Sequence, residues 1–192
     1  MSLIAITGGI GSGKSVVSNI LRAMCRPVYD CDSEAKRLMT DDAELRAALK
    51  GAFGEETYDK FGRLNRYYLA SRVFGNSDAL TTVNCLVHPA VKRDVERWAT
   101  QQATNDAWVE TALLLESGMD GMVDEAWLVE APIETRVERV IARDGSDREQ
   151  VLQRISRQTL PDDESCSCPL RRIVNDGRRA LLPQIFRLLQ GR

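Results

Sequence analysis

The feature that most constrains this sequence is a glycine-rich segment that directly follows a short apolar run. The run covers residues 3–7, and the eight residues from Gly8 to Ser15 read GGIGSGKS, which fits the G-x-x-x-x-G-K-[ST] pattern of a phosphate-binding loop. Glycines allow positive φ angles, so successive N–H groups can gather around a polyphosphate, and the helix that follows adds its positive N-terminal end. The segment therefore predicts a strand, a phosphate-binding loop and a helix, in that order.

Positions within this loop have distinct expected tasks. We expect Lys14 to reach the β- and γ-phosphates of a nucleotide, and Ser15 to ligate Mg²⁺. The nucleotide contacts that the motif predicts are Gly11, Ser12, Gly13, Lys14 and Ser15.

Two rival nucleotide sites fit the sequence less well. A dinucleotide fingerprint G-x-G-x-x-G that starts at Gly9 would need its third glycine at Lys14, whose side chain would stand where helix and strand must pack closely. A GTP-binding switch is expected to carry an N-K-x-D segment to select guanine, and the sequence has none. The pattern favours an ATP-dependent enzyme.

Short apolar runs alternate with amphipathic helical stretches, which is typical of a parallel α/β sheet. We expect strands at residues 3–7, 27–29, 108–115, 126–130 and 172–174. Strand signals vanish from about 33 to 102, which predicts a helical insertion whose last helix begins at His88-Pro89, with proline in the first turn. The expected architecture is a single P-loop domain over residues 1–192, with three α/β/α layers.

Composition excludes several classes of protein. The 192 residues carry 26 Lys+Arg against 28 Asp+Glu, so no global basic field favours nucleic acid or an anionic membrane. No apolar run approaches the ~18 residues that a membrane span requires. Five scattered cysteines without a zinc spacing fit the reduced thiols of a cytosol. We expect a cytoplasmic protein with no nucleic-acid, membrane or obligate protein partner.

Two carboxylates follow the second expected strand, at the edge where parallel sheets bind ligands. Asp30 and Asp32 could each simply cap the next helix. The functional alternative for Asp32 is a base that accepts the proton of an attacking hydroxyl. His88, the only histidine, could merely form the turn before its helix.

Arginines are concentrated between residues 136 and 157, on both sides of a short Asp-Gly-Ser-Asp turn. Most helical arginines are simply solvated, but two helices with arginine at both rims of a turn suit a lid that closes over a triphosphate. A guanidinium offers planar, bidentate donors to phosphate oxygens. We therefore predict a lid at about 136–158, with Arg143 and Arg148 as its phosphate-binding residues.

Together these segments resemble the dephospho-coenzyme A kinases over nearly the whole chain. The matching stretches read ITGGIGSGKS, VYDCDSEAKRLM, GRLNRYYLASRVF, NCLVHPAV, ALLLES, REQVLQRISRQ and VNDG. The resemblance implies transfer of the ATP γ-phosphoryl group to the ribose 3′-hydroxyl of dephospho-CoA, with ATP and Mg²⁺ as cofactors.

The same resemblance assigns roles to single residues. It implies that Asp32 is the catalytic aspartate and Arg143 the lid arginine that acts with Lys14. It places the acceptor against Thr7 and against a helical CoA-binding insertion that holds Arg66 and His88. The nucleotide contacts that it adds are Val16, Asn175 and Gly177. The chain departs from the family pattern at Val16, Ala112 and Val174, where these enzymes usually carry Thr, Pro and Asp.

Two other functions stay open at this point. One is a P-loop kinase for another small acceptor, such as a nucleoside monophosphate or a small alcohol. The other is a nucleotide-binding regulator that hydrolyses little ATP and signals by closure.

Overall fold

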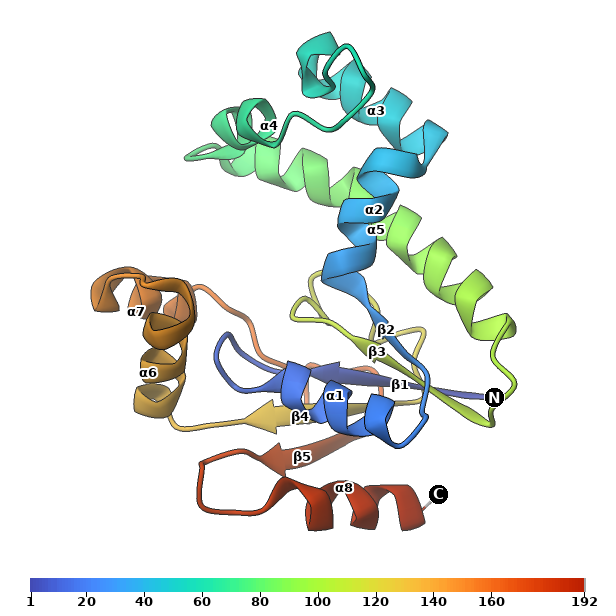
Figure 1. Ribbon diagram of the computed structural model, residues 1–192, viewed down its shortest axis with the longest axis vertical. Helices are drawn as coiled ribbons and strands as arrows, with labels where there is room; N and C mark the ends of the chain where they lie inside the picture. The colour runs from blue at the N-terminus through green and yellow to red at the C-terminus, as the bar shows by residue number, and fades with distance from the viewer. Residues whose placement is uncertain (192) are drawn as a thin grey trace. The chain divides into compact units, whose positions relative to one another are not determined.

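The structure, a computed structural model, describes residues 1–191 and divides into two compact units (Figure 1). The first unit combines Met1–Tyr29 with the chain from Gln102 onward, and the second is Asp30–Gln101. The first unit holds the sheet, and the second is helical. Within residues 1–191, no helix is long and apolar enough to cross a membrane.

The sheet has five strands in the order β2-β3-β1-β4-β5. They are β1 (Ser2–Thr7), β2 (Val28–Asp30), β3 (Asp106–Glu110), β4 (Glu125–Glu130) and β5 (Leu170–Val174). Pairing is parallel between β1 and β3, β1 and β4, and β4 and β5. The predicted parallel α/β fold is confirmed. The central strands appear as continuous apolar runs because both of their faces are buried.

The core of the first unit lies where α1 (Lys14–Ala23) and α8 (Leu181–Gln190) cover one face of the sheet (Figure 1). Trp108 of β3 and Trp127 of β4 meet there edge to face, with ring centroids 6.0 Å apart. Ile185 of α8 is fully buried in the same cluster. Burial of such large apolar side chains is the main favourable term in the folding of this unit.

The edge strand β5 gave a weak sequence signal because arginines interrupt it. Arg171 and Arg172 are exposed, and they pair with Glu125 and Glu130 of the neighbouring β4 at 3.6 and 2.7 Å. Only Ile173 of this strand is fully buried. These arginines therefore occupy the surface of the sheet without interrupting its core.

The second unit consists of helices α2 (Cys31–Asp41), α3 (Ala43–Phe53), α4 (Arg66–Val73) and α5 (Ser77–Thr100), with a short 3₁₀ turn at Glu55–Thr57. Helix α5 packs against both α2 and α3. Arg37 of α2 binds Asp94 of α5 at 2.7 Å, and the Tyr58 hydroxyl donates to the carbonyl of Met39 at 2.6 Å.

Two element boundaries predicted from sequence are wrong. The strand expected at 108–115 ends at Glu110, and the following apolar residues form turns in which Leu114 is nonetheless buried. Helix α5 begins at Ser77 instead of His88, so Pro89 lies inside it. The helix tolerates this proline because Val87, Val91 and Val95 share one buried face, and their packing outweighs the lost N–H.

The observed start of α5 predicts the effect of removing its cap. The Asn76 side chain accepts hydrogen bonds from the N–H groups of Asp78 and Ala79, each at 3.1 Å. Asn76→Ala should lower the free energy of unfolding by about 1 kcal/mol, measured by urea denaturation. Asn76→Asp keeps the accepting oxygen and should be nearly neutral. Equal stability of the alanine variant and the wild type would contradict this start.

Candidate active site

The glycine-rich loop connects β1 to α1, and its geometry suits an anion. Lys14 begins α1, and its Nζ donates to the carbonyls of Gly8 and Gly9 at 2.8 and 3.3 Å. Gly13 precedes the helix with φ 95° and offers no side chain as a cap. Val16 of the first turn donates its N–H to the Gly13 carbonyl at 3.0 Å. The N-terminal end of an α-helix favours an anion, because its first N–H groups point out of the helix and its dipole is positive there.

Glycine is required here for close approach as well as for conformation. A Cβ on Gly13 would lie 2.1 Å from Nδ2 of Asn175. A Cβ on Gly11, whose φ is 76°, would lie 2.5 Å from the carbonyl oxygen of Arg136. Two other segments of the first unit therefore touch the loop where it has no side chains.

Asn175 supports the outer side of the loop. Its side chain is 8% exposed, and its Nδ2 donates to the Ser12 carbonyl at 2.7 Å. Arg139 of α6 donates to the carbonyls of Gly11 and Ser12 at 3.4 Å each, and to Oδ1 of Asn175 at 3.3 Å. The amide of Asn175 thus holds the loop. Contacts of Asn175 and of the exposed Gly177 with adenine stay a prediction.

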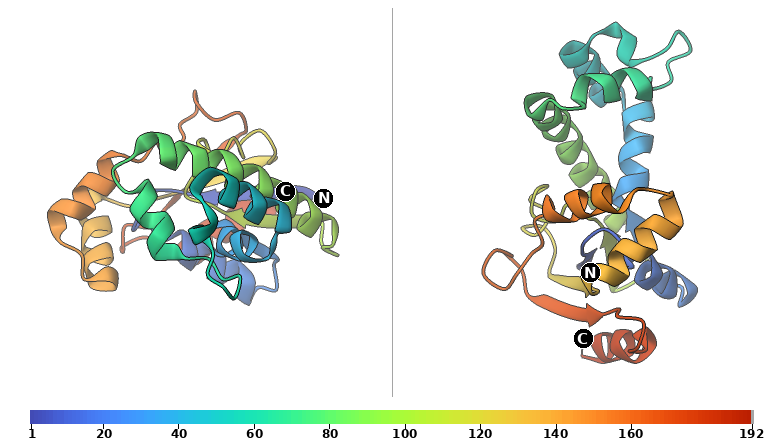
Figure 2. Two further views of the ribbon diagram at one scale, coloured as in Figure 1. Left: turned by 90° about the horizontal axis from the view of Figure 1, so that it is seen from above. Right: turned by 90° about the vertical axis from the view of Figure 1, so that its left-hand side faces the viewer.

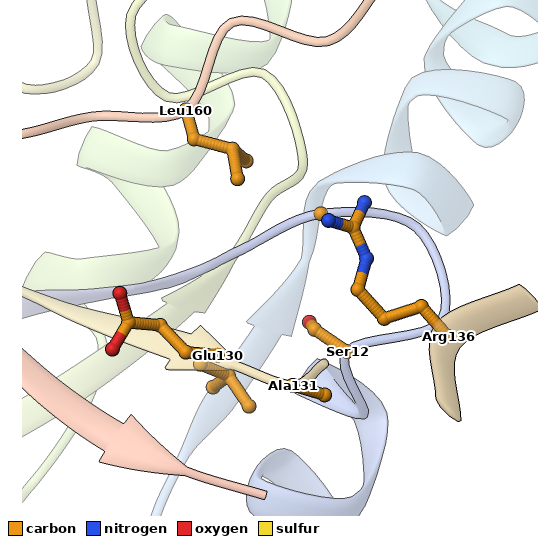
Figure 3. A pocket seen from close by; sticks show the side chains of 7 residues that line it. Ser12, Glu130, Ala131, Arg136 and Leu160 are labelled. Carbon is orange, nitrogen blue, oxygen red and sulfur yellow. The ribbon is translucent and has the colours of Figure 1, made fainter. Parts of the chain in front are cut away.

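A cavity of about 130 Å³ lies between the loop and the end of β4 (Figure 3). The buried hydroxyl of Ser12 has no hydrogen-bond partner among residues 1–191. Arg136 lines this cavity across from Glu130, and burial lowers the pKa of its guanidinium. The residues that line the cavity are Gly9, Ser12, Val129, Glu130, Ala131, Arg136 and Leu160.

The predicted lid segment forms two packed helices, α6 (Ile133–Asp144) and α7 (Arg148–Ser156) (Figure 2). Arg143 binds both carboxylate oxygens of Asp144 at 2.7 and 2.9 Å, which raises the pKa of the guanidinium. Arg148 binds Glu134 at 2.6 Å. Both arginines are largely exposed, so a phosphate could replace these carboxylates at little cost.

The two carboxylates after β2 have different surroundings. Oδ1 of Asp30 accepts from the N–H groups of Asp32 and Ser33 at 3.1 and 3.2 Å, so Asp30 is the cap of α2. Asp32 lies in the first turn, exposed, and does not cap the helix. The capping interpretation is therefore correct for Asp30 and wrong for Asp32.

The remaining predicted residues belong to different parts of the chain. Thr7 is buried at the end of β1, and Ser15 and Val16 follow Lys14 in α1, with the Val16 side chain exposed. In the second unit, Arg66 begins α4 and His88 lies within α5. Their approach, with Asp32, to the loop stays a prediction.

Sequence reasoning did not single out four residues that the structure places at the loop or at the end of the strand beside β1. Arg136, Arg139 and Gln158 contact the loop, yet the helical arginines looked solvated, and Gln158 follows α7 without any local pattern. Glu110 ends β3, and it pairs in register with Ile6, the residue before Thr7. Glu110 lies at the carboxyl end of a strand, where parallel sheets bind ligands, and this position could have identified it as a candidate site residue.

A phosphate loop on a parallel sheet, with an arginine-bearing helix pair after β4, supplies what phosphoryl transfer needs, namely alignment and positive charge. These features define a P-loop kinase.

The family model for dephospho-CoA kinase matches residues 2–180. A dephospho-CoA kinase from Bacteroides fragilis strain YCH46 is 42% identical over 187 residues, covering 97% of this chain and 90% of the relative. The one from Porphyromonas gingivalis is 39% identical over 190 residues, covering 99% and 94%.

Solved structures of similar fold support the same family relationship. A crystal structure from Thermus thermophilus has a TM-score of 0.79 and 34% identity, and the match covers 99% of this chain and 95% of that one. The Campylobacter jejuni dephospho-CoA kinase has the same fold, with a TM-score of 0.67 and 20% identity over 98% of this chain and 95% of that one. The chain belongs to the dephospho-CoA kinase family, which phosphorylates dephospho-CoA with ATP.

The contact between Gly13 and Asn175 predicts a strong effect of one added methyl group. Gly13→Ala should weaken MgATP binding by about tenfold or more, because positive φ costs a residue with a Cβ roughly 1–2 kcal/mol and the Asn175 amide must move as well. Titration calorimetry measures the dissociation constant. Gly51→Ala, in α3 with no atom within 4 Å of the new Cβ, is the matched control and should bind MgATP normally. Unchanged binding by Gly13→Ala would contradict the assignment.

Proposed function

We propose that this chain transfers the γ-phosphoryl group of ATP to the ribose 3′-hydroxyl of dephospho-CoA by in-line attack, using Asp32, Lys14 and Arg143. The observation that carries this proposal is the phosphate loop itself, with Lys14 at the uncapped start of α1, in a chain of this family. Phosphoryl transfer depends mainly on alignment and charge neutralisation, and both are properties of such a loop.

Each proposed catalytic residue has a distinct task. Lys14, bound to loop carbonyls, turns its ammonium group to the β- and γ-phosphates. Arg143 exchanges Asp144 for phosphate oxygens and stabilises the charge of the transition state. The exposed carboxylate of Asp32, oriented by the capped first turn of α2, accepts the proton of the 3′-hydroxyl.

Two residues of the first unit offer oxygen atoms of the kind that a magnesium ion binds. Mg²⁺ prefers oxygen ligands and keeps several waters. Ser15 offers a hydroxyl in the first turn of α1, and Glu110 offers a carboxylate at the end of the strand next to β1. We propose that Ser15 ligates the ion directly and that Glu110 holds its waters. When bound, Mg²⁺ neutralises charge on the β- and γ-phosphates.

The helical unit is the proposed acceptor-binding insertion, in which Arg66 and His88 contact dephospho-CoA. The arginine begins α4, and the histidine lies in α5. Thr7 would contact the acceptor from the first unit, at the end of β1. A cytoplasmic location fits such a biosynthetic enzyme and is part of the proposal. The family relationship does not favour a different small acceptor or a non-catalytic regulator.

The acceptor is tested by measuring ADP release from MgATP in parallel reactions. One contains dephospho-CoA, two contain AMP or shikimate, and one contains no acceptor. We expect turnover with dephospho-CoA only, and a product heavier by one phosphoryl group. Turnover with another acceptor instead would refute the proposed substrate, while ATP binding without any turnover would favour the regulator.

The base is tested by a matched pair of aspartate variants. Asp32→Asn should lower kcat by about 10²-fold or more, because it removes the proton acceptor, and should leave the KM for ATP unchanged. Asp30→Asn keeps a capping oxygen and should turn over almost normally. Steady-state kinetics with dephospho-CoA measures both. Near-normal turnover of Asp32→Asn would exclude Asp32 from the chemistry.

A further inference from the structure

Ile10, in the middle of the phosphate loop, makes three contacts with the lid segment, two through its backbone and one through its side chain. Its N–H donates to Oε1 of Gln158 at 2.7 Å, and its carbonyl accepts from Nε of Arg136 at 2.8 Å. Its side chain packs against the lid's own apolar cluster, formed by Val137, Val140 and Val151. A single loop residue thus has its backbone and its side chain bound by the two helices and the segment after them.

The two polar side chains also bind each other. Nη2 of Arg136 donates to the same Oε1 of Gln158 at 3.2 Å, so the three residues form a closed ring of hydrogen bonds. We call Arg136 and Gln158 the Ile10 clamp. The N–H and the carbonyl of Ile10 are thus both bound by the clamp.

Arg136 carries a buried positive charge. The residue is 6% exposed, and its guanidinium donates to two neutral oxygens, the carbonyl of Ile10 and Oε1 of Gln158. A buried guanidinium that is bound only to neutral oxygens costs stability compared with an apolar side chain. Arginine keeps its proton at physiological pH, so it places a permanent positive charge beside an anion site.

We propose that Arg136 and Gln158 are positioning residues for phosphoryl transfer, which clamp Ile10 and thereby couple the phosphate loop to the lid. This inference rests on the proposed function and concerns residues to which that function gives no role. The start of α6 and the end of α7 then move together with the loop. Only the turn between Arg143 and Arg148 can close independently of the loop. Binding of triphosphate in the loop orders the lid, and an ordered lid strengthens binding of triphosphate.

Gly9 is the loop residue that makes room for the clamp. A Cβ there would lie 2.1 Å from Nη2 and 2.5 Å from Cζ of Arg136, while Gly9 is not among the glycines with positive φ. An alanine at this position would therefore displace the guanidinium of Arg136 without straining the backbone. Figure 3 shows this guanidinium beside the loop, across the cavity from Glu130.

The first experiment compares MgATP dissociation constants, measured by direct titration without acceptor. Arg136→Met and Gln158→Leu should each weaken binding by about 10- to 100-fold, the range for loss of a charge-assisted hydrogen bond. Arg136→Lys keeps one donor to Ile10 and should recover part of the affinity. Arg157→Met, an exposed arginine next to Gln158, is the matched control and should bind as the wild type does. Binding of dephospho-CoA alone should not change in any of these variants.

The second experiment crosses Gly9→Ala with Arg136→Met. Gly9→Ala alone should weaken MgATP binding about as much as Arg136→Met, because the new methyl group displaces the guanidinium. Methionine lacks the atoms that clash, so Gly9→Ala should cost nothing further in the Arg136→Met background. Full additivity of the two changes, or wild-type binding by both Arg136→Met and Gln158→Leu, would overturn the proposal.

These results are separate from the acceptor test. If dephospho-CoA is not phosphorylated while the dissociation constants follow this pattern, the clamp stands and the proposed function fails. Melting temperatures of the same variants show whether the fold is retained. If a variant unfolds, Arg136→Lys takes its place in the comparison. An MgATP affinity between those of the wild type and Arg136→Met is expected for Arg136→Lys only if the hydrogen bond to Ile10 contributes to MgATP binding.

Discussion

The phosphate loop depends on hydrogen bonds to its outer carbonyls. A glycine-rich segment loses more conformational freedom on folding than any other sequence, so it needs partners to keep one shape. Here Arg136, Arg139 and Asn175 bind three successive carbonyls, those of Ile10, Gly11 and Ser12. These side chains come from α6, which follows β4, and from the residue after β5, so the shape of the loop depends on the strands beside β1. The inward N–H groups are then preorganised toward an anion, and little reorganisation is needed when charge develops in the reaction.

Local patterns in the sequence were enough to predict the sheet, the loop and the two helices after β4, because each depends on neighbouring residues. The supports of the loop could not be predicted in this way. Arg136, Gln158 and Asn175 lie 126, 148 and 163 residues from the loop residues that they bind, and no spacing rule connects such positions. The start of α5 was missed for a related reason. Proline favours the first turn of a helix, but the buried face around Val87 and Val91 carries the helix through Pro89.

Asp30 fixes the backbone that carries the neighbouring carboxylate, Asp32. Both looked equally able to cap a helix, since each is followed by residues typical of a first turn. In the structure Asp30 takes the cap and binds the N–H of Asp32 itself. The second carboxylate is therefore left in water but on a fixed backbone. An exposed carboxylate on a rigid support suits the proposed transfer of a proton from an aligned hydroxyl to Asp32, and it costs the fold no buried charge.

The arginines of β5 have a consequence for how this protein behaves among other chains. β5 is the last strand in the sheet order, and the outer side of such a strand exposes backbone groups that could pair with a strand from another molecule. Arg171 and Arg172 keep the strand charged along its length, held in place by glutamates of β4. These charges oppose edge-to-edge pairing of β5 with a strand of another molecule. Their neutralisation would endanger solubility long before it affected nucleotide binding.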